Sequence, residues 1–251
     1  MILEIDVGNT RIKWRTLNDG AVADRGAVPK ESLDQWLLSE GFNQGLSQMP
    51  EKIRLSCVAN QVIVQRLVEQ AKQWGCLLQE AKTNCIAAGV RCGYEEPEAL
   101  GVDRWLAVVA AFNKFKQPCV VVDAGSALTV DLVDGTGQHL GGYIVPGLGM
   151  MREALFKGTS QVKVDTLAKA SVSPGGSTKE AVTNGSLFMI KSMIESAVES
   201  LGSKAGIVQL VITGGDGDYL IKVLNEKACY LPDLVMDGLA LVIPESELGE
   251  E

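Results

Sequence analysis

Apolar and polar positions along the chain alternate in an order that predicts strands and helices. Three aliphatic runs separated by turn residues predict three successive strands, the first ending at Asp6 and the others over residues 11–17 and 21–28. A helix over about 31–40 is expected after Pro29, and a buried strand over 53–58 follows it. Asn60 is a candidate N-cap of the next helix, in which apolar residues recur at helical spacing. The first part of the chain therefore predicts the order β-β-β-α-β-α.

The same order begins again at Cys119, which indicates an internal duplication. A shift of 117 positions superimposes Asp6 on Asp123, Gly8 on Gly125, Gly20 on Gly137, Val28 on Val145 and Pro29 on Pro146. A helix is expected after Pro146, and further helices and one strand are expected over 178–201, 207–212 (the strand), 218–224 and 234–243. A repeat of this length predicts two related α/β domains, residues 1–115 and 116–251, with the natural ligand site in the cleft between them.

The tip of the first hairpin carries candidate chemistry for binding an anion. Asp6 ends the first strand, and Gly8-Asn9-Thr10 is expected to turn the chain with positive φ angles, which Gly accepts and Asn tolerates. Backbone N–H groups, the Thr10 hydroxyl and the cations Arg11 and Lys13 would face a phosphate, and Asp6 could hold a metal ion beside it. An ordinary hairpin turn is the alternative interpretation of the same residues.

The segment that joins the two copies contains a second group of candidate residues. A helix is expected over 101–115, with Asp103 and Arg104 in its first turn. Asp103 is either a carboxylate that the helix dipole favours or a general base that accepts a hydroxyl proton during phosphoryl transfer from ATP. Arg104 is correspondingly either a solvated neighbour or the ligand of an anionic substrate group.

Composition and charge exclude several classes of protein. Hydrophobic residues make up 46% of the chain and charged residues 22%, values typical of a soluble globular protein. No apolar run reaches the roughly 18 residues that a membrane span needs, so no membrane partner is expected. The net charge of −8 argues against a nucleic-acid partner. Glu4 and Asp6 interrupt the apolar N-terminus, which disfavours a signal peptide and predicts a cytoplasmic protein.

Cysteine and histidine usage narrows the possible mechanisms. The six cysteines are scattered without a C-x-x-C pair, which favours reduced thiols over disulfides or a metal site. The only histidine, His139, follows a Gly-rich turn, and we expect it to be solvent-exposed and structural. A mechanism that depends on a Ser-His or Cys-His pair is therefore disfavoured, because the chain has a single histidine. A carboxylate is the simpler candidate for a catalytic base.

Six motifs in chain order together resemble the type III pantothenate kinases. These motifs are residues 6–10, 94–97, 101–104, 123–131, 141–147 and 213–216. The resemblance implies an α/β fold of two tandem ribonuclease-H-like domains, an actin-like ATPase duplication with the active site in the interdomain cleft, as in the acetate and sugar kinase, heat-shock ATPase and actin superfamily. It also implies ATP-dependent phosphorylation of pantothenate to 4′-phosphopantothenate, the first step of coenzyme A biosynthesis.

The resemblance further implies the role of each matching residue. ATP, with Mg²⁺, would be bound by Asp6, Val7, Gly8, Asn9, Thr10, Arg11, Ile12, Lys13 and Ser126. Pantothenate would be bound by Tyr94, Gly101, Val102, Asp103, Arg104 and Thr178. Asp103 would be the catalytic base, and Asp123 would bind a monovalent cation, K⁺ or NH₄⁺. Glu95-Glu96 departs from the family, which commonly has an Asn before the Pro. The polar contacts beside the substrate can therefore differ from those of the family, while the reaction is expected to be the same.

The resemblance also implies a homodimer in which the partner subunit supplies Thr178. The alternative role of Thr178 is to cap the helix that starts there, and both roles are compatible. Ile190, Met193, Ile194 and Ala197 recur at helical spacing and serve either as core or as interface, with core the default.

Two other functions are open on the sequence: a kinase of another small hydroxy acid on the same fold, and a non-catalytic relative that assists transcription. The retention of four candidate site residues argues against loss of activity, and they are Asp6, Asp103, Arg104 and Asp123.

Overall fold

A computed structural model describes residues 1–38, 49–58, 61–157, 170–224 and 228–244 of the chain. Asn60, the candidate N-cap, lies outside these residues, as do parts of the helix expected over 31–40. The chain forms two compact units. Unit 1 comprises residues 1–88, 94–110 and 235–251, and unit 2 comprises residues 89–93 and 111–234. Each unit thus includes a segment from the other half of the chain, while the division of the duplicated sequence at residue 115 stays a prediction.

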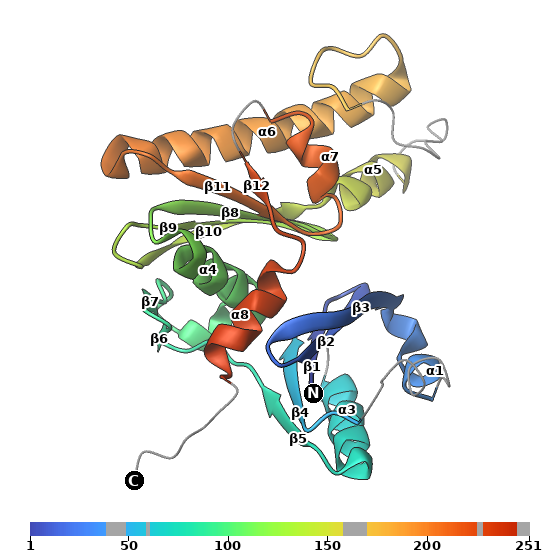
Figure 1. The fold of residues 1–251 in the computed structure, drawn as a ribbon. Coiled ribbons are helices and arrows are strands. Elements are labelled where there is room, and N and C mark those ends of the chain that lie inside the picture. Colours follow the sequence, from blue (N-terminus) through green and yellow to red (C-terminus); the bar gives the residue numbers. More distant parts are fainter. Residues whose placement is uncertain (39–48, 59–60, 158–169, 225–227, 245–251) are drawn as a thin grey trace. The chain divides into compact units, whose positions relative to one another are not determined.

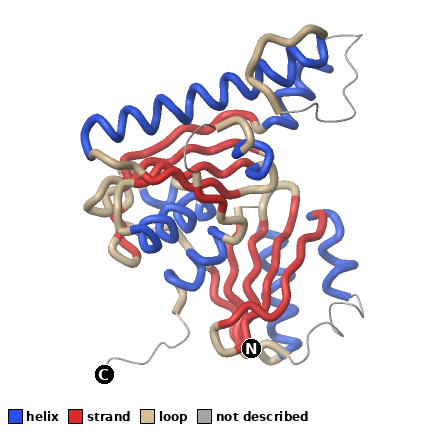
Figure 2. The backbone as a smooth tube through the Cα atoms, turned by 45° about the horizontal axis from the view of Figure 1, so that its top comes forward, coloured by secondary structure: helices blue, strands red, loops and turns tan. Residues whose placement is uncertain are grey.

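Unit 1 is built on a five-stranded mixed sheet. Its strands are β1 (Ile2–Val7), β2 (Arg11–Asn18), β3 (Ala21–Pro29), β4 (Lys52–Cys57) and β5 (Leu77–Glu80), in the order β3-β2-β1-β4-β5. The first three strands are antiparallel neighbours, whereas β4 and β5 run parallel to β1. The helical elements η1 (Lys30–Ser32), α1 (Leu33–Leu38) and α3 (Gln61–Trp74) connect the strands (Figures 1 and 2). The buried face of α3 carries Val64, Leu67 and Ala71, which recur at the helical spacing that the sequence predicts.

Unit 2 repeats the same sheet. Its strands are β8 (Cys119–Ala124), β9 (Ala127–Val133), β10 (His139–Pro146), β11 (Gln209–Thr213) and β12 (Cys229–Tyr230), in the order β10-β9-β8-β11-β12. Strand directions match those of unit 1 pair for pair, which confirms the predicted duplication. Helices α5 (Leu148–Lys157), α6 (Thr178–Ala205) and α7 (Gly217–Ile221) belong to this unit, and α6 lies along one face of its sheet (Figure 1).

The repeat is exact in β1 and β3 but not in the strand between them. Asp6 pairs with Lys13, seven positions further on, whereas Asp123 pairs with Thr129, six positions further on. The second hairpin turn is therefore one residue shorter. Residues of β2 match those of β9 at a shift of 116, so that Arg15 of unit 1 corresponds to Asp131 of unit 2.

The remaining elements join the two halves or close the chain. They are β6 (Ile86–Ala87), β7 (Val90–Arg91), η2 (Pro97–Ala99), α4 (Val102–Phe115) and α8 (Leu234–Val242). The long helices were predicted to within a few residues, but the short strands β5, β6, β7 and β12 were not, because two to four residues carry too little periodicity. Within the residues that the structure describes, no helix combines the length and apolarity that crossing a membrane requires.

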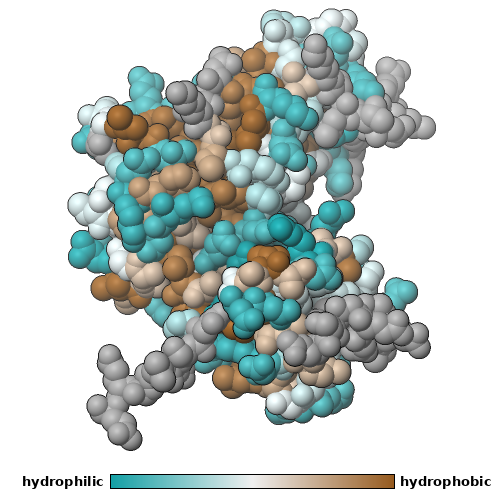
Figure 3. All heavy atoms as spheres, in the orientation of Figure 1, coloured by the Kyte–Doolittle hydropathy of each residue, from teal (hydrophilic) through white to brown (hydrophobic). Residues whose placement is uncertain are grey.

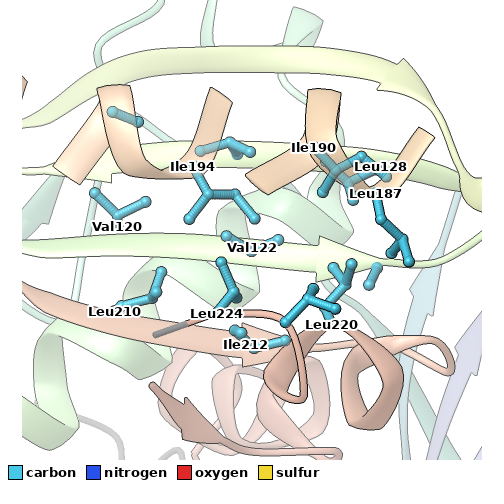
Figure 4. Close-up of a cluster of buried hydrophobic side chains, with 14 of the residues drawn as sticks. Val120, Val122, Leu128, Leu187, Ile190, Ile194, Leu210, Ile212, Leu220 and Leu224 are labelled. Atoms are coloured by element: carbon cyan, nitrogen blue, oxygen red, sulfur yellow. The ribbon is translucent and has the colours of Figure 1, made fainter. Parts of the chain in front are cut away.

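Each unit has its own hydrophobic core. In unit 2 the side chains of Leu187, Ile190 and Ile194 project from α6 onto Val120 and Val122 of β8 (Figure 4). Ala197 is also buried, and Met193 packs against the cluster. These positions of α6 are therefore core, as the default expectation had it, and other residues of α6 face solvent.

A buried ion network crosses the sheet of unit 1. The carboxylate of Glu4, which has no exposed surface, accepts hydrogen bonds from Arg15 and from Nη1 of Arg54, the latter at 2.7 Å. Arg15 Nη1 also donates to Asp237 of α8 at 2.8 Å. Burial alone would lower the pKa of Arg15, but the two carboxylates raise it overall. The network thereby ties α8 to the N-terminal sheet.

Candidate active site

The tip of the first hairpin is closed by backbone hydrogen bonds. Gly8 N–H donates to the Arg11 carbonyl at 3.0 Å, and Lys30 N–H donates to the Thr10 carbonyl at 3.0 Å. Neither Gly8 nor Asn9 has a positive φ, so the expected reason for these residue types was wrong. Gly8 is suited to the turn by space instead, because a Cβ there would lie 3.3 Å from the Arg11 carbonyl oxygen.

Asp6 is a buried carboxylate at the end of β1. It is 8% exposed and accepts a hydrogen bond at 2.9 Å from Ser56 Oγ, on the neighbouring strand β4. Burial raises the pKa of Asp6 to about 6, against the lowering effect of the Ser56 hydrogen bond. The charge of Asp103 raises this pKa further, and that of Lys13 lowers it. Two carboxylates, from β1 and α4, are thus close enough in unit 1 to repel each other.

Asp103 lies in the first turn of α4, as predicted. Its Oδ1 accepts the Arg104 backbone N–H at 2.8 Å, which fits the expected carboxylate at a helix N-terminus. Gly101 leaves room for this carboxylate, because a Cβ at Gly101 would lie 2.8 Å from Asp103 Oδ1. The helix-terminal role and a role as base are compatible, because each oxygen of a carboxylate can accept more than one hydrogen bond.

Arg104 and Tyr94, two of the predicted pantothenate-binding residues, are in contact. Arg104 is buried, and its Nη1 donates to the Tyr94 hydroxyl at 3.1 Å. The guanidinium carbon lies 5.8 Å from the centroid of the Tyr94 ring, within the range of a cation–π contact. Unit 1 therefore brings together Tyr94, Arg104, Asp103 and Asp6.

The second hairpin tip, in unit 2, is surrounded by glycine motifs. Gly125 N–H donates to the Ala127 carbonyl at 3.1 Å, and Gly147 N–H donates to the Ser126 carbonyl at 3.0 Å. Gly214 has a φ of 89°, and a Cβ there would lie 2.4 Å from Asp123 Oδ1. No role was predicted for Gly147 and Gly214, although both stand in motifs that the chain shares with the type III pantothenate kinases. The presence of glycine at these positions could have indicated a role, because only glycine lets the backbone approach its neighbours so closely.

An acidic residue follows Gly214 and Gly215 and also contacts the second hairpin. Asp216 N–H donates to the Ala124 carbonyl at 2.9 Å. Burial raises the pKa of Asp216, while Arg152 lowers it in part. The turn over 213–216 is therefore fixed to the end of β8, next to Asp123.

Thr178 is the first residue of α6 and is exposed. The N-cap is Ser177, whose side chain accepts the Glu180 N–H at 3.2 Å, and Glu180 Oε2 accepts the Gly176 N–H at 2.8 Å. The capping role that we considered for Thr178 therefore belongs to its neighbour.

His139 is buried, and the prediction that it is solvent-exposed was wrong. Its Nε2 lies 2.9 Å from Asp131 Oδ1, and its Nδ1 accepts the Gly93 N–H at 3.4 Å. The Gly-rich turn ends one residue earlier, and β10 begins at His139, so its side chain projects inward. Sequence pattern could not show this, because the partners come from β9 and from the segment before Tyr94.

A comparison with known families explains why these residues occur together. The model of the type III pantothenate kinase family matches residues 2–200 of this chain. The chain belongs to the type III pantothenate kinase family. A curated relative of that name from Chromohalobacter salexigens is 36% identical over 250 residues, which cover 97% of this chain and 88% of the relative.

Solved structures show that the fold is shared more widely. A protein named for the Baf family of transcriptional activators, from Campylobacter jejuni, is similar with a TM-score of 0.63 and 23% identity, and the match covers 96% of each chain. Lmo2764 from Listeria monocytogenes, named for N-acetylmannosamine kinase activity, is similar with a TM-score of 0.50 and 10% identity over 95% of this chain and 96% of that one. These likenesses show that both proteins share the fold of this chain.

Proposed function

We propose that this chain transfers a phosphoryl group from ATP to the hydroxyl of pantothenate, which forms 4′-phosphopantothenate, the first step of coenzyme A biosynthesis. Membership of the type III pantothenate kinase family supports the reaction. The observation that carries it within the structure is the placement of Asp103 beside Asp6 and next to the Arg104–Tyr94 pair. A proton acceptor, a phosphate-binding turn and an anion-binding cation are the parts that such a transfer requires.

Asp103 is the proposed general base. It accepts the hydroxyl proton of pantothenate as the hydroxyl oxygen bonds to the γ-phosphorus of ATP and the bond to the ADP oxygen breaks. Arg104 and Tyr94 bind the pantothenate carboxylate, because a guanidinium and a phenol both donate hydrogen bonds to it. Gly101 and Val102 line the same turn and bring their backbone to the substrate.

Residues Asp6 to Lys13 and Ser126 are the proposed ATP-binding residues. The carboxylate of Asp6 fits a nearby Mg²⁺, because carboxylate oxygens are ligands that Mg²⁺ prefers and because burial disfavours the ionised carboxylate unless a cation neutralises it. The Mg²⁺ that accompanies ATP would neutralise charge on the phosphates. Lys13, which already lowers the pKa of Asp6, adds a cation at the same hairpin.

Asp123 is the proposed site of a monovalent cation, K⁺ or NH₄⁺. Its carboxylate oxygens can coordinate K⁺ or accept hydrogen bonds from NH₄⁺, and Gly214 lies close to Oδ1. ADP formation by the wild type with pantothenate is therefore expected to rise when K⁺ replaces Na⁺. Asp123→Asn is expected to abolish this dependence, and a dependence that survives in the variant would contradict the assignment.

The exposed face of α6 supports a homodimer that involves Thr178. Thr178, Gly185, Phe188 and Met189 recur at helical spacing, and Phe188 and Met189 are each more than half exposed. A Cβ on Gly185 would meet open space, so the helix backbone is accessible there. Hydrophobic patches on the surface of unit 2, to which α6 belongs, are visible in Figure 3. Such a stripe favours burial against a second copy of the chain.

The six cysteines, all of them in the described part of the chain, form no disulfides there, which supports the proposed location of the enzyme in the cytoplasm, a reducing compartment that contains ATP.

A coupled assay of ADP formation with saturating pantothenate, Mg·ATP and K⁺ tests the proposed function. Asp103→Asn is expected to lower kcat by about 10²- to 10⁴-fold, the usual contribution of a general base, while unfolding by urea is little changed. Glu98→Gln is a matched control, because Glu98 is an exposed carboxylate in the preceding turn. Absence of ADP with the wild type would refute the function, and an active Asp103→Asn would move the base elsewhere.

Mixing two inactive variants tests whether Thr178 acts across the dimer. Asp103→Asn and Thr178→Ala are combined after subunit exchange, and heterodimers are quantified by native mass spectrometry. If the partner supplies Thr178, each heterodimer contains one native site, and an equal mixture regains about a quarter of wild-type activity. Heterodimers without regained activity would place Thr178 in the site of its own subunit.

A further inference from the structure

The only histidine of the chain forms a buried polar pair in unit 2. The side chains of His139 and Asp131 are 0% and 3% exposed, and Nε2 lies 2.9 Å from Oδ1. Because an ionised carboxylate only accepts hydrogen bonds, Nε2 carries the proton. The Nδ1 atom of a neutral ring then has a free lone pair, and it accepts the Gly93 N–H at 3.4 Å. Asp131 thus selects the tautomer that can hold Gly93.

Gly93 ends a segment that is attached to the start of β10 at more than one point. Arg91 N–H donates to the Gly137 carbonyl at 2.8 Å, two residues before His139. A Cβ on Gly93 would lie 2.0 Å from the His139 carbonyl oxygen, so only glycine can approach this closely. Residues 89–93 therefore belong to unit 2, although their neighbours in sequence belong to unit 1.

The duplicated sheet shows that the fold itself does not require this pair. Val22 corresponds to His139 at the shift of 117, and it is 40% exposed. Arg15, the counterpart of Asp131, uses its buried charge to bind Asp237 of α8. In unit 1 the buried charge of Arg15 on β2 thus binds a segment from the other half of the chain directly, whereas in unit 2 Asp131 on β9 binds His139, and His139 contacts such a segment at Gly93.

We infer that His139 is a positioning residue for Tyr94. The peptide that His139 holds is joined directly to Tyr94, whose hydroxyl accepts a hydrogen bond from Arg104. When the backbone just before Tyr94 is held in place, the Tyr94 side chain has less conformational freedom in the free enzyme. It therefore loses less conformational entropy when substrate binds. This inference rests on the proposed function, in which Tyr94 and Arg104 bind the pantothenate carboxylate.

Two substitutions separate the contacts of His139. His139→Asn places a side-chain oxygen near the position of Nδ1 and keeps an acceptor for Gly93, whereas His139→Gln places an amide nitrogen near Nε2 and keeps only the donor to Asp131. We expect His139→Gln to raise KM for pantothenate about fivefold, the effect of one net hydrogen bond, with kcat and KM for ATP little changed. His139→Asn is expected to stay nearer the wild-type KM.

Hydrogen exchange at the Gly93 amide, followed by NMR, provides a readout without substrate. Exchange is expected to be faster than wild type in His139→Gln and closer to wild type in His139→Asn. Unchanged exchange in both variants, or equal effects of the two substitutions on KM for pantothenate, would overturn the inference. Parallel changes in kcat and in KM for both substrates would indicate a merely structural role and would also overturn it.

The activity of the wild type distinguishes failure of this inference from failure of the proposed function. A wild type that forms no ADP with pantothenate overturns the proposed function, and the role of His139 at Tyr94 falls with it. An active wild type with an unaffected His139→Gln variant overturns only the inference about His139.

Discussion

Replacing Asp6 by Asn should stabilise the protein while it weakens ATP binding. Asn has nearly the same shape as Asp. It keeps an oxygen that can accept the hydrogen bond from Ser56 Oγ, which is 2.9 Å from Asp6 Oδ1 in the wild type. It removes a negative charge that is buried and lies near the charge of Asp103. The wild type therefore maintains an unfavourable ionised group at a place where, in our proposal, the Mg²⁺ that accompanies ATP binds.

The size of the effect follows from the pKa of Asp6. That pKa rises from 3.8 to about 6 on folding. The difference of about 2.2, at about 1.36 kcal/mol for each pKa unit, corresponds to about 3 kcal/mol. Because the folded protein binds more protons than the unfolded chain between these two values, the Asp6 contribution to the free energy of unfolding falls as pH rises through this window. The stabilisation by Asp6→Asn is thus expected to be about 0.5 kcal/mol at pH 4 and about 3 kcal/mol at pH 8.

Urea unfolding of both proteins at several pH values between 4 and 8 measures this difference directly. Comparing variant with wild type at each pH removes the contributions of the other titrating groups. Repeating the comparison in an Asp103→Asn background should give a smaller stabilisation at pH 8, because one cause of the raised pKa is then absent. A variant that is less stable than wild type at pH 8, or a difference that does not change with pH, would refute the reasoning.

Two further predictions concern positions where packing leaves little freedom. Arg54→Met leaves the buried Glu4 carboxylate with one arginine in place of two, and it is expected to lower the free energy of unfolding by about 3–5 kcal/mol in urea titrations; a loss below about 1 kcal/mol would show that Glu4 finds another partner. Gly214→Ala forces a Cβ against Asp123 and is expected to raise KM for ATP and the K⁺ requirement. Gly215→Ala, where a Cβ meets nothing within 4 Å, is its matched control, and equal effects of both would contradict the steric argument.

Local pattern was sufficient for the long elements and for the duplication, but not for the short strands β5, β6, β7 and β12. The apolar runs of β1 and β8 and the face of α3 depend on residues that are neighbours in sequence, so their periodicity carries the information. Asp6 and Asp123 could likewise be recognised as matching strand ends. The candidate site residues could be named from their motifs, although Gly147 and Gly214 were left without a role.

Only the tertiary structure decided how these residues work together. The proximity of Asp6 and Asp103, the contact between Arg104 and Tyr94, and the burial of His139 all join residues from different elements. Sequence periodicity indicates which face of an element is buried, but it does not identify the segment that packs against that face. The sequence by itself therefore determined a duplicated α/β fold with two acidic turns. Packing between distant segments determined which carboxylate is costly to ionise and which side chains contact the proposed substrate-binding residues.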